Sequence, residues 1–132
     1  MARRETVVPE EMKVLHERFQ YAPGVKAGPL LFMAGQLGRD ENLNAVQDKE
    51  AQFVQAFVNV EKVLKEAGVT FDDVVDMVTY HTDMRDLELF MKVKERFFTN
   101  PEKVPAWTAL GVAALAQPGM FAEVKCTALL PD

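Results

Sequence analysis

A carboxylate near the C-terminus of the chain could transfer protons. In the stretch FAEVKCTALL, whose residue pattern predicts a strand, Glu123 lies between Ala122 and Val124. On an open surface Glu123 would pair with Lys125 or a cross-strand neighbour and contribute little. In a cleft between subunits, burial would raise its pKa and suit it to general acid–base chemistry. Both interpretations stay open on these residues alone.

The single tryptophan, Trp107, begins another predicted strand in the segment KVPAWTALGV. Trp107, Ala109 and Gly111 alternate onto one face of that strand, and small residues beside a large ring can leave space as readily as they pack. Trp107 is therefore either a buried core residue or the wall of a ligand pocket. In a pocket, its ring would stack on an aromatic or unsaturated ligand and its indole N–H would hold a carbonyl.

The sequence gives little support for a metal site or for a catalytic nucleophile. His81 and Asp83 alternate onto one strand face, but His16 is the only other histidine and no Cys/His metal spacing is present. We expect His81 to be structural, with proton transfer as the alternative. Cys126 faces away from Glu123 and is expected to be a small buried residue. Serine is absent, which excludes a serine nucleophile.

These residues are positioned by alternating strands and helices. Helical periodicity over 46–67 places five apolar residues on one stripe, and Gly68 is expected to end that helix. Polar residues lie away from the stripe. The apolar positions are Phe53, Phe57, Val60, Leu64 and Ala67, and the polar positions are Lys49, Gln52, Gln55, Asn59, Lys62 and Glu66.

The predicted order of elements is β-β-α-β-α-β-β. The stretch FQYAPGVKAG carries a Pro-Gly turn signal between two short extended pieces, which predicts a hairpin partner for the next strand. Asp86 is a plausible N-cap for the second helix. Helices are expected over 46–67 and 87–98, and strands over 29–38, 74–82, 106–114 and 121–130.

Two helices and five or six strands predict an α+β layer in which both helices cover one face of a mixed sheet. In the strand PLLFMAGQLG, apolar residues fall on both alternating faces: Leu31 and Met33 on one, Leu30 and Phe32 on the other. The helix-free face should therefore also be hidden, and self-association is the economical way to hide it.

The 132 residues fit one domain, 1–132, with a net charge of −5 and no basic cluster interleaved with aromatics. Nucleic acid is thus a poor candidate partner. No apolar run approaches the roughly 20 residues that span a bilayer. With one cysteine and no signal-peptide pattern, the chain is expected to be cytoplasmic and without a membrane partner.

Three segments together, YAPGVKAGPLLFMAGQLG, VEKVLKEAGVTFDDVVDMVTYHTDM and PAWTALGVAAL followed by FAEVKCTALL, resemble the RidA/YjgF family of imine and enamine deaminases. The resemblance covers residues 18–130. It implies a chorismate-mutase-like α+β fold and a homotrimer with clefts between subunits. It also implies hydrolysis of reactive imines to a keto acid and ammonia, a form of metabolite damage control, without metal or organic cofactor.

Four family positions are kept, as the resemblance implies. Glu123 matches the glutamate that positions or activates water, which favours its catalytic interpretation. Tyr21 matches a cleft tyrosine, though it could simply pack. Ala34 and Gly35 match the small pair whose backbone lies near the ligand, and Gly35 could equally permit close strand approach.

Three family positions are changed. Trp107 stands where the deaminases have the arginine that anchors the substrate carboxylate, Met91 where they commonly have asparagine, and Ala109 where many have cysteine. Tryptophan has no charge, so a small 2-imino acid would lose its anchor. The sequence resembles a branch with Trp-Thr-Ala in place of the arginine motif.

Three functions follow from this pattern. The first is a cofactor-free hydrolase acting on a non-standard imine or enamine, with Glu123 aligning water and Trp107 shaping the pocket. The second is a non-catalytic member that binds a small carbonyl or aromatic metabolite in the same cleft. The third is the endoribonuclease activity with which the family has been labelled, and the acidic balance of the chain argues against it.

Overall fold

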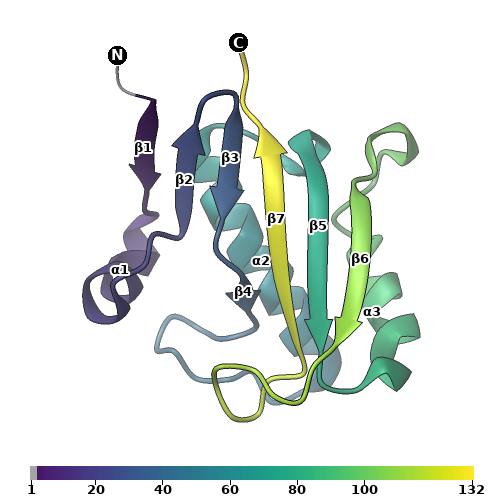
Figure 1. Ribbon diagram of the computed structural model, residues 1–132. Helices are drawn as coiled ribbons and strands as arrows, with labels where there is room; N and C mark the ends of the chain where they lie inside the picture. The colour runs from purple at the N-terminus through teal and green to yellow at the C-terminus, as the bar shows by residue number, and fades with distance from the viewer. Residues whose placement is uncertain (1–2) are drawn as a thin grey trace.

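A computed structural model describes residues 3–132, and its central feature is a seven-stranded mixed sheet (Figure 1). Six strands follow the spatial order β1-β2-β3-β7-β5-β6, and the short β4 pairs with β7. Neighbours are antiparallel except β5 and β6, which are parallel. The strands are β1 (Arg4–Val7), β2 (Gly24–Ala27), β3 (Leu30–Met33), β4 (Gln36–Leu37), β5 (Val74–His81), β6 (Ala106–Gly111) and β7 (Ala122–Leu129).

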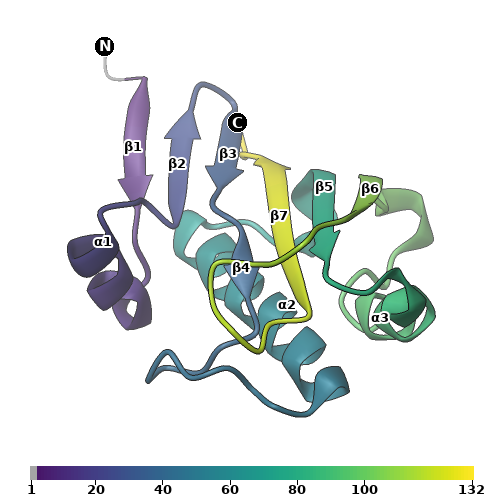
Figure 2. The same cartoon turned by 60° about the horizontal axis from the view of Figure 1, so that its bottom comes forward.

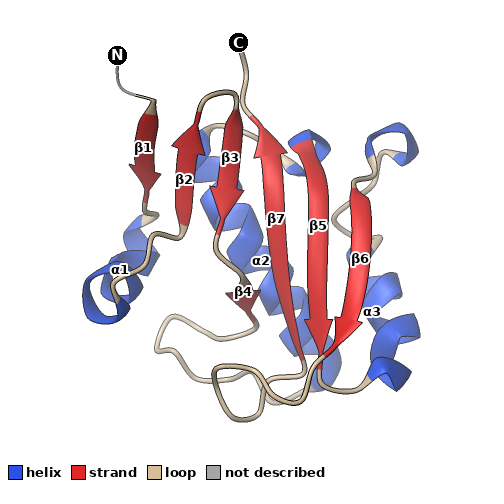
Figure 3. Cartoon of the chain, in the orientation of Figure 1, coloured by secondary structure: helices blue, strands red, loops and turns tan. Residues whose placement is uncertain are grey.

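Two of the three α-helices cover one face of this sheet, which confirms the predicted α+β layer (Figure 3). They are α2 (Lys49–Ala67) and α3 (Leu87–Lys94). All five residues of the predicted apolar stripe of α2 are buried. Gly68 ends the helix with φ 83°, a left-handed conformation that glycine adopts without steric cost. The helical period thus placed this element correctly, apart from three residues at its start.

The N-terminal part differs from the prediction. A short third helix, α1 (Lys13–Phe19), lies at the β1–β2 edge, at the far side from α3 (Figure 2). Pro23 and Gly24 do not form the hairpin turn; β2 begins at Gly24, and the turn to β3 lies at Gly28, which has φ 59°. The predicted strand over 29–38 is also divided into β3 and β4, with Ala34 and Gly35 between them.

The second helix and its flanks also end earlier than predicted. The α-helix stops at Lys94, and a turn over 95–97 and an irregular segment over 98–100 lead to Pro101. Asp86 does not cap α3 with its side chain but accepts a hydrogen bond from Lys49 Nζ at 2.9 Å. The Asp86 side chain thus pairs with a lysine distant in the sequence and does not cap the helix as its position had predicted.

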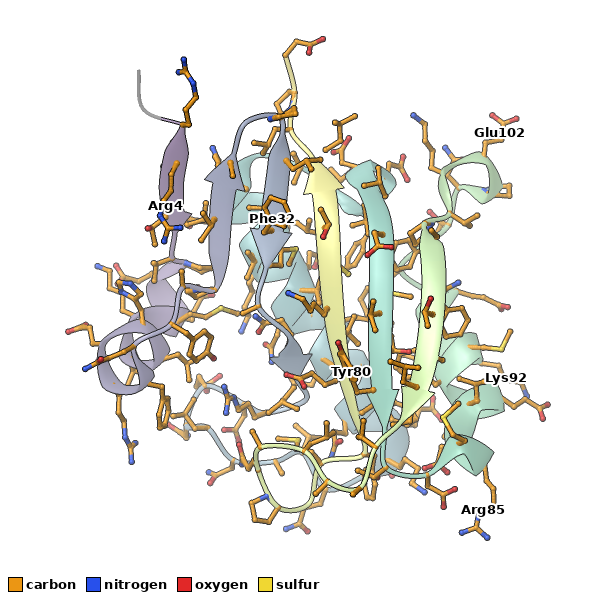
Figure 4. All side chains as sticks on the ribbon, viewed as in Figure 1. Arg4, Phe32, Tyr80, Arg85, Lys92 and Glu102 are labelled. Carbon is orange, nitrogen blue, oxygen red and sulfur yellow. The ribbon has the colours of Figure 1, made fainter. Side chains whose placement is uncertain are left out.

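The sheet face opposite α2 is uncovered in the single chain. Phe32 and Tyr80 lie on this face (Figure 4). Phe32, Leu110 and Leu129 remain 47%, 45% and 48% exposed. By contrast, Leu31 and Met33, which alternate with Phe32, are 0% and 1% exposed against the helices. The predicted second apolar face therefore exists.

None of the helices within residues 3–132 has the length and apolar character needed to cross a bilayer.

Candidate functional site

An open cleft of about 790 Å³ lies where four separate segments meet. The end of α1 and the following Tyr21 form one wall, and the segment from Ala34 to Leu43 forms the second. The loop residues 116–118 between β6 and β7 close a third side, and Glu123 of β7 contributes the carboxylate. Of the seven predicted site residues, four therefore come together here: Glu123, Tyr21, Ala34 and Gly35.

Glu123 lies on the helix-free side of the sheet. Its neighbours Ala122 and Val124 are buried against the helices, so alternation directs Glu123 the other way. It is half-buried, and burial raises the pKa of its carboxyl group above the ordinary value. The positive charges of Arg39 and Lys125 oppose that shift. A raised pKa makes this carboxylate a better proton acceptor than an exposed glutamate, as general acid–base chemistry requires.

Gly35 provides the space in which the Glu123 carboxylate lies. A Cβ placed on Gly35 would collide with the Oε2, Cδ and Cγ atoms of Glu123. The φ of Gly35 is not in the left-handed region, so the requirement for glycine is one of space and not of backbone conformation. Ala34 is anchored beside it by a 2.9 Å hydrogen bond from its N–H to the Pro23 carbonyl.

Tyr21 belongs to a hydrogen-bonded group that was not identified from the sequence. Arg39 donates from Nη2 to the Tyr21 hydroxyl at 3.0 Å and from Nη1 to Gln117 Oε1 at 3.2 Å. Gln117 in turn donates from Nε2 to the Leu43 carbonyl at 2.9 Å. Arg39 directly follows the predicted strand at 29–38, which is the signal that could have marked it. Gln117 in a Pro-Gly loop carried none.

Two polar residues of α2 that lie away from its apolar stripe are nevertheless buried and hold the cleft loops in place. Gln52 is fully buried; it donates to the carbonyls of Val46 and Gly119 and accepts from the Phe121 N–H. Asn59 is 6% exposed and donates to the carbonyls of Leu37 and Arg39. These amides satisfy loop backbone groups that would otherwise be buried without partners.

Trp107, Ala109 and Met91 lie elsewhere in the single chain. Trp107 and Ala109 are half-buried on the helix side of β6, and Met91 of α3 is 42% exposed. The Trp107 ring packs against Phe90 at 6.2 Å between centroids, and Lys94 Nζ lies 5.0 Å from the ring centre. Because Glu123 is on the opposite face of the sheet, these three residues do not line its cleft within one chain.

The Trp107 indole N–H is already engaged. It donates to Thr79 Oγ1 at 2.9 Å. It is therefore not free to hold a substrate carbonyl, and any ligand contact of Trp107 must use the ring itself.

His81 continues this buried chain of polar groups. Its Nε2 lies 2.7 Å from Thr79 Oγ1, whose own hydrogen is free to be donated to it. That arrangement places the proton of neutral His81 on Nδ1. Both His81 Nδ1 and Asp86 Oδ2 are buried without a hydrogen-bond partner among the described residues. Burial lowers the pKa of His81, while the charge of Asp86 acts to raise it.

This environment makes His81 a structural residue and predicts an acid-sensitive fold. Since the folded-state pKa of His81 is depressed, the stability it contributes is present above about pH 6.5 and is lost as pH falls. One proton changes the unfolding free energy by at most about 1.4 kcal/mol per pH unit. We expect the melting temperature between pH 7.5 and 5.5 to fall less in His81→Gln than in the natural protein. The exposed variant His16→Gln should keep the natural pH profile; equal slopes in all three proteins would contradict the assignment.

Asp83 and Cys126 are set apart from the cleft. Asp83 pairs with Arg85, which holds the pKa of that carboxyl down at about 2, so it is committed to a surface ion pair and not to His81. Burial raises the pKa of the Cys126 thiol to about 12, which leaves it un-ionised at neutral pH. Within residues 3–132, no group of three or more His, Cys, Asp or Glu side chains is placed to hold a metal ion.

Residues 13–130 match the protein family described as Endoribonuclease L-PSP. The RutC family protein YjgH of Escherichia coli (strain K12) is 37% identical over 133 residues, which cover 100% of this chain and 99% of that protein. The solved structure titled protein YJGH superposes with a TM-score of 0.90 at 36% identity, covering 99% of both chains.

A more distant relative carries a chemical name. The 2-iminobutanoate/2-iminopropanoate deaminase of Salmonella typhimurium (strain LT2) is 31% identical over 97 residues, which cover 72% of this chain and 76% of that enzyme. The chain is thus similar over its whole length to YjgH and over most of its length to a relative named as a deaminase.

Proposed function

Since the chain belongs to the RidA/YjgF family, described as Endoribonuclease L-PSP, we propose that it hydrolyses a reactive imine or enamine to a carbonyl compound and ammonia. The observation that carries this proposal is the half-buried Glu123 carboxylate in an open cleft, with Gly35 leaving room for it. The name of the Salmonella relative supports the same reaction class.

The proposed reaction needs few groups because an imine carbon is already electrophilic. Glu123 accepts a proton from a water molecule as the water oxygen bonds to that carbon. The C=N electron pair moves to nitrogen, and Glu123 passes the water proton to that nitrogen, which gives a neutral tetrahedral adduct carrying one hydroxyl and one amino group. Glu123 then takes the hydroxyl proton and delivers it to the amino nitrogen as the C–N bond breaks, so that ammonia leaves and the hydroxyl oxygen becomes the carbonyl oxygen. A raised carboxyl pKa suits both halves of this transfer.

We further propose that the working site is shared between copies of the chain in a homotrimer. Glu123, Tyr21, Ala34 and Gly35 lie at one cleft, while Trp107, Ala109 and Met91 lie near the β6 edge. These seven residues would form one site only if the β6 edge of one copy faced the cleft of the next copy. The uncovered apolar sheet face supports such an assembly, since association would bury Phe32, Leu110 and Leu129. Light scattering at micromolar concentration should give a trimer mass, and a monomer mass would exclude the shared site.

The substrate is proposed to differ from the simplest 2-imino acids. Trp107 brings a ring face but no charge, and its N–H is bonded to Thr79. A ring face favours flat, unsaturated or aromatic substrates, which stack on it.

A second function, binding of a carbonyl or aromatic metabolite without turnover, is favoured by the same two features of Trp107. Ligand-induced thermal stabilisation without ammonia release would support it. RNA cleavage, which the family description names, is disfavoured by the net charge of −5. Salt-sensitive RNA binding would reopen that function.

The test of the proposed function is ammonia and keto-acid release from a panel of enzymatically generated imines, both small and aromatic. We expect the natural protein to act on the larger imines and Trp107→Arg to gain activity on small 2-imino acids. If the protein binds the keto-acid products but ammonia is released from every imine only at the uncatalysed rate, the hydrolase proposal is wrong and the binding function is favoured.

A further inference from the structure

Arg39 is a cation in the Glu123 cleft, and within residues 3–132 no carboxylate pairs with it directly. Its two hydrogen-bonding partners, the Tyr21 hydroxyl and the Gln117 amide oxygen, are both neutral. A half-buried guanidinium that forms no ion pair retains its attraction for an anion.

The guanidinium also retains donors. Of the five N–H groups that an arginine carries, one on Nη1 and one on Nη2 are used. The remaining three are available to a planar anion, for which a carboxylate is the geometric match. Arg39 lines the same cleft as Glu123, and its charge acts on the Glu123 carboxyl. An anion held by Arg39 would thus lie in the cavity where the proposed chemistry takes place.

Two other cations lie in or beside the cleft. Arg18 lines it and lies over its neighbour Phe19, with its guanidinium carbon 5.1 Å from the ring centre. Lys125 donates from Nζ to the Met33 carbonyl at 2.9 Å, and it does not line the cleft. Arg39 differs from both because neutral side chains on two other segments fix its orientation. This fixed orientation lowers the entropic cost of binding a ligand.

We propose that Arg39 determines specificity for substrates that carry a carboxylate, and that it supplies from the 38–48 loop the charge that Trp107 lacks. The inference rests on the proposed function, because it assigns the substrate class of that same site. It places the carboxylate anchor on the Tyr21 side of the cleft and leaves the Trp107 ring for the rest of the substrate.

The competing explanation is that Arg39 only ties three loops together. Its two hydrogen bonds link Tyr21, the 38–48 loop and the 112–121 loop, so its loss could loosen the cleft for every ligand. The two explanations differ in one measurable quantity. If Arg39 only ties the loops together, its loss lowers the affinity for charged and uncharged ligands alike. If it anchors an anion, its loss lowers the affinity for charged ligands only.

The experiment compares the affinities of phenylpyruvate, an aromatic keto acid, and its uncharged methyl ester, measured by calorimetry or ligand-observed NMR. The natural protein should bind the acid at least about tenfold more tightly than the ester, as expected for a charge-assisted bidentate contact. Arg39→Gln should reduce that ratio to about one, and Arg39→Lys should keep part of it. Lys125→Gln removes one positive charge as well and should leave the ratio unchanged.

Gln117→Leu separates the two explanations even if Arg39→Gln fails to fold. It removes two hydrogen bonds, the one from Arg39 and the one to the Leu43 carbonyl, but it keeps the Arg39 charge and the Arg39–Tyr21 bond, so the preference for the acid should persist. Retention of the ratio in a folded Arg39→Gln, or its loss in Gln117→Leu, would overturn the proposal. The binding ratio and the turnover assay test the two proposals separately. If Arg39→Gln loses the acid preference but the natural protein hydrolyses no imine, the hydrolase is rejected and the Arg39 anchor is kept. If the natural protein hydrolyses imines but Arg39→Gln keeps the acid preference, the anchor is rejected and the hydrolase is kept.

Discussion

Replacing Glu123 with glutamine is expected to lower kcat/KM for imine hydrolysis by about 10²–10⁴-fold, the usual contribution of a general acid–base residue. Glutamine fills nearly the same volume beside Gly35 but cannot accept a proton from water. The loss should appear in ammonia release while keto-acid binding is kept. The surface variant Glu102→Gln should behave like the natural protein. Activity retained in Glu123→Gln would remove this residue from the chemistry.

The same substitution is expected to stabilise the fold. Burial raises the pKa of Glu123, so the ionised carboxylate is disfavoured in the folded protein and stability falls as pH rises through that folded-state pKa. At pH 7 to 8 the glutamine variant should therefore melt at a higher temperature than the natural protein. An inactive but stabilised variant is the signature of a site that has given up stability for function.

Adding one methyl group at Gly35 is expected to have the second-largest effect. In Gly35→Ala the new Cβ would overlap the Glu123 carboxylate, which must move. Displacement of a catalytic group by about 1 Å can cost on the order of 10²-fold in rate. The atoms that must move belong to a flexible side chain beside an open cleft, so the free energy of unfolding should change much less than the activity. The measurements are ammonia release and denaturant unfolding.

Gly111→Ala is the matched control for this prediction. Its added Cβ would lie 3.3 Å from Met84 Cγ, the middle of a flexible side chain that can shift. We expect only a small change in activity and stability there. If Gly35→Ala were as active as the control, the close approach of Gly35 and Glu123 would not matter for function.

The parts of the fold that were predictable from the sequence are those fixed by local periodicity. The stripe containing Phe53 and Phe57 is determined by a 3.6-residue repeat, and Gly68 ends its helix through its own conformational freedom. The 13–19 helix was missed because it is short and buries only Leu15, so its sequence carries almost no amphipathic signal.

The cleft was harder to predict, because polar residues that hold it together are buried in ways the local sequence does not indicate. Gln52 and Asn59 lie in the helix as ordinary polar positions, and their burial depends on loop backbone groups brought to them by the tertiary fold. The place of Arg39 directly after a predicted strand could have marked it, but its contacts could not be predicted, because its partners Tyr21 and Gln117 are 18 and 78 residues away along the chain. Such contacts have no local sequence signature.

The site predictions divide along the same line. The resemblance to a family identified Glu123, Tyr21 and Gly35, and the structure places them at one cleft. It also identified Trp107, but the chain alone puts the two halves of that list on opposite faces of the sheet. Strand alternation predicts the face of each residue, whereas the way in which copies associate is not encoded in any single element.

The central claim is that Glu123 of one copy and Trp107 of its neighbour build one imine-hydrolysing site, and subunit mixing tests it most directly. Glu123→Gln and Trp107→Ala chains would be purified separately, shown to be folded, mixed in equal amounts, dissociated and reassembled. Each variant alone should release little ammonia. In the mixture, a site combining both natural residues arises with a probability of about one quarter, so about a quarter of the natural activity should return. No recovery in verified mixed trimers, or full activity in Trp107→Ala alone, would contradict the shared site.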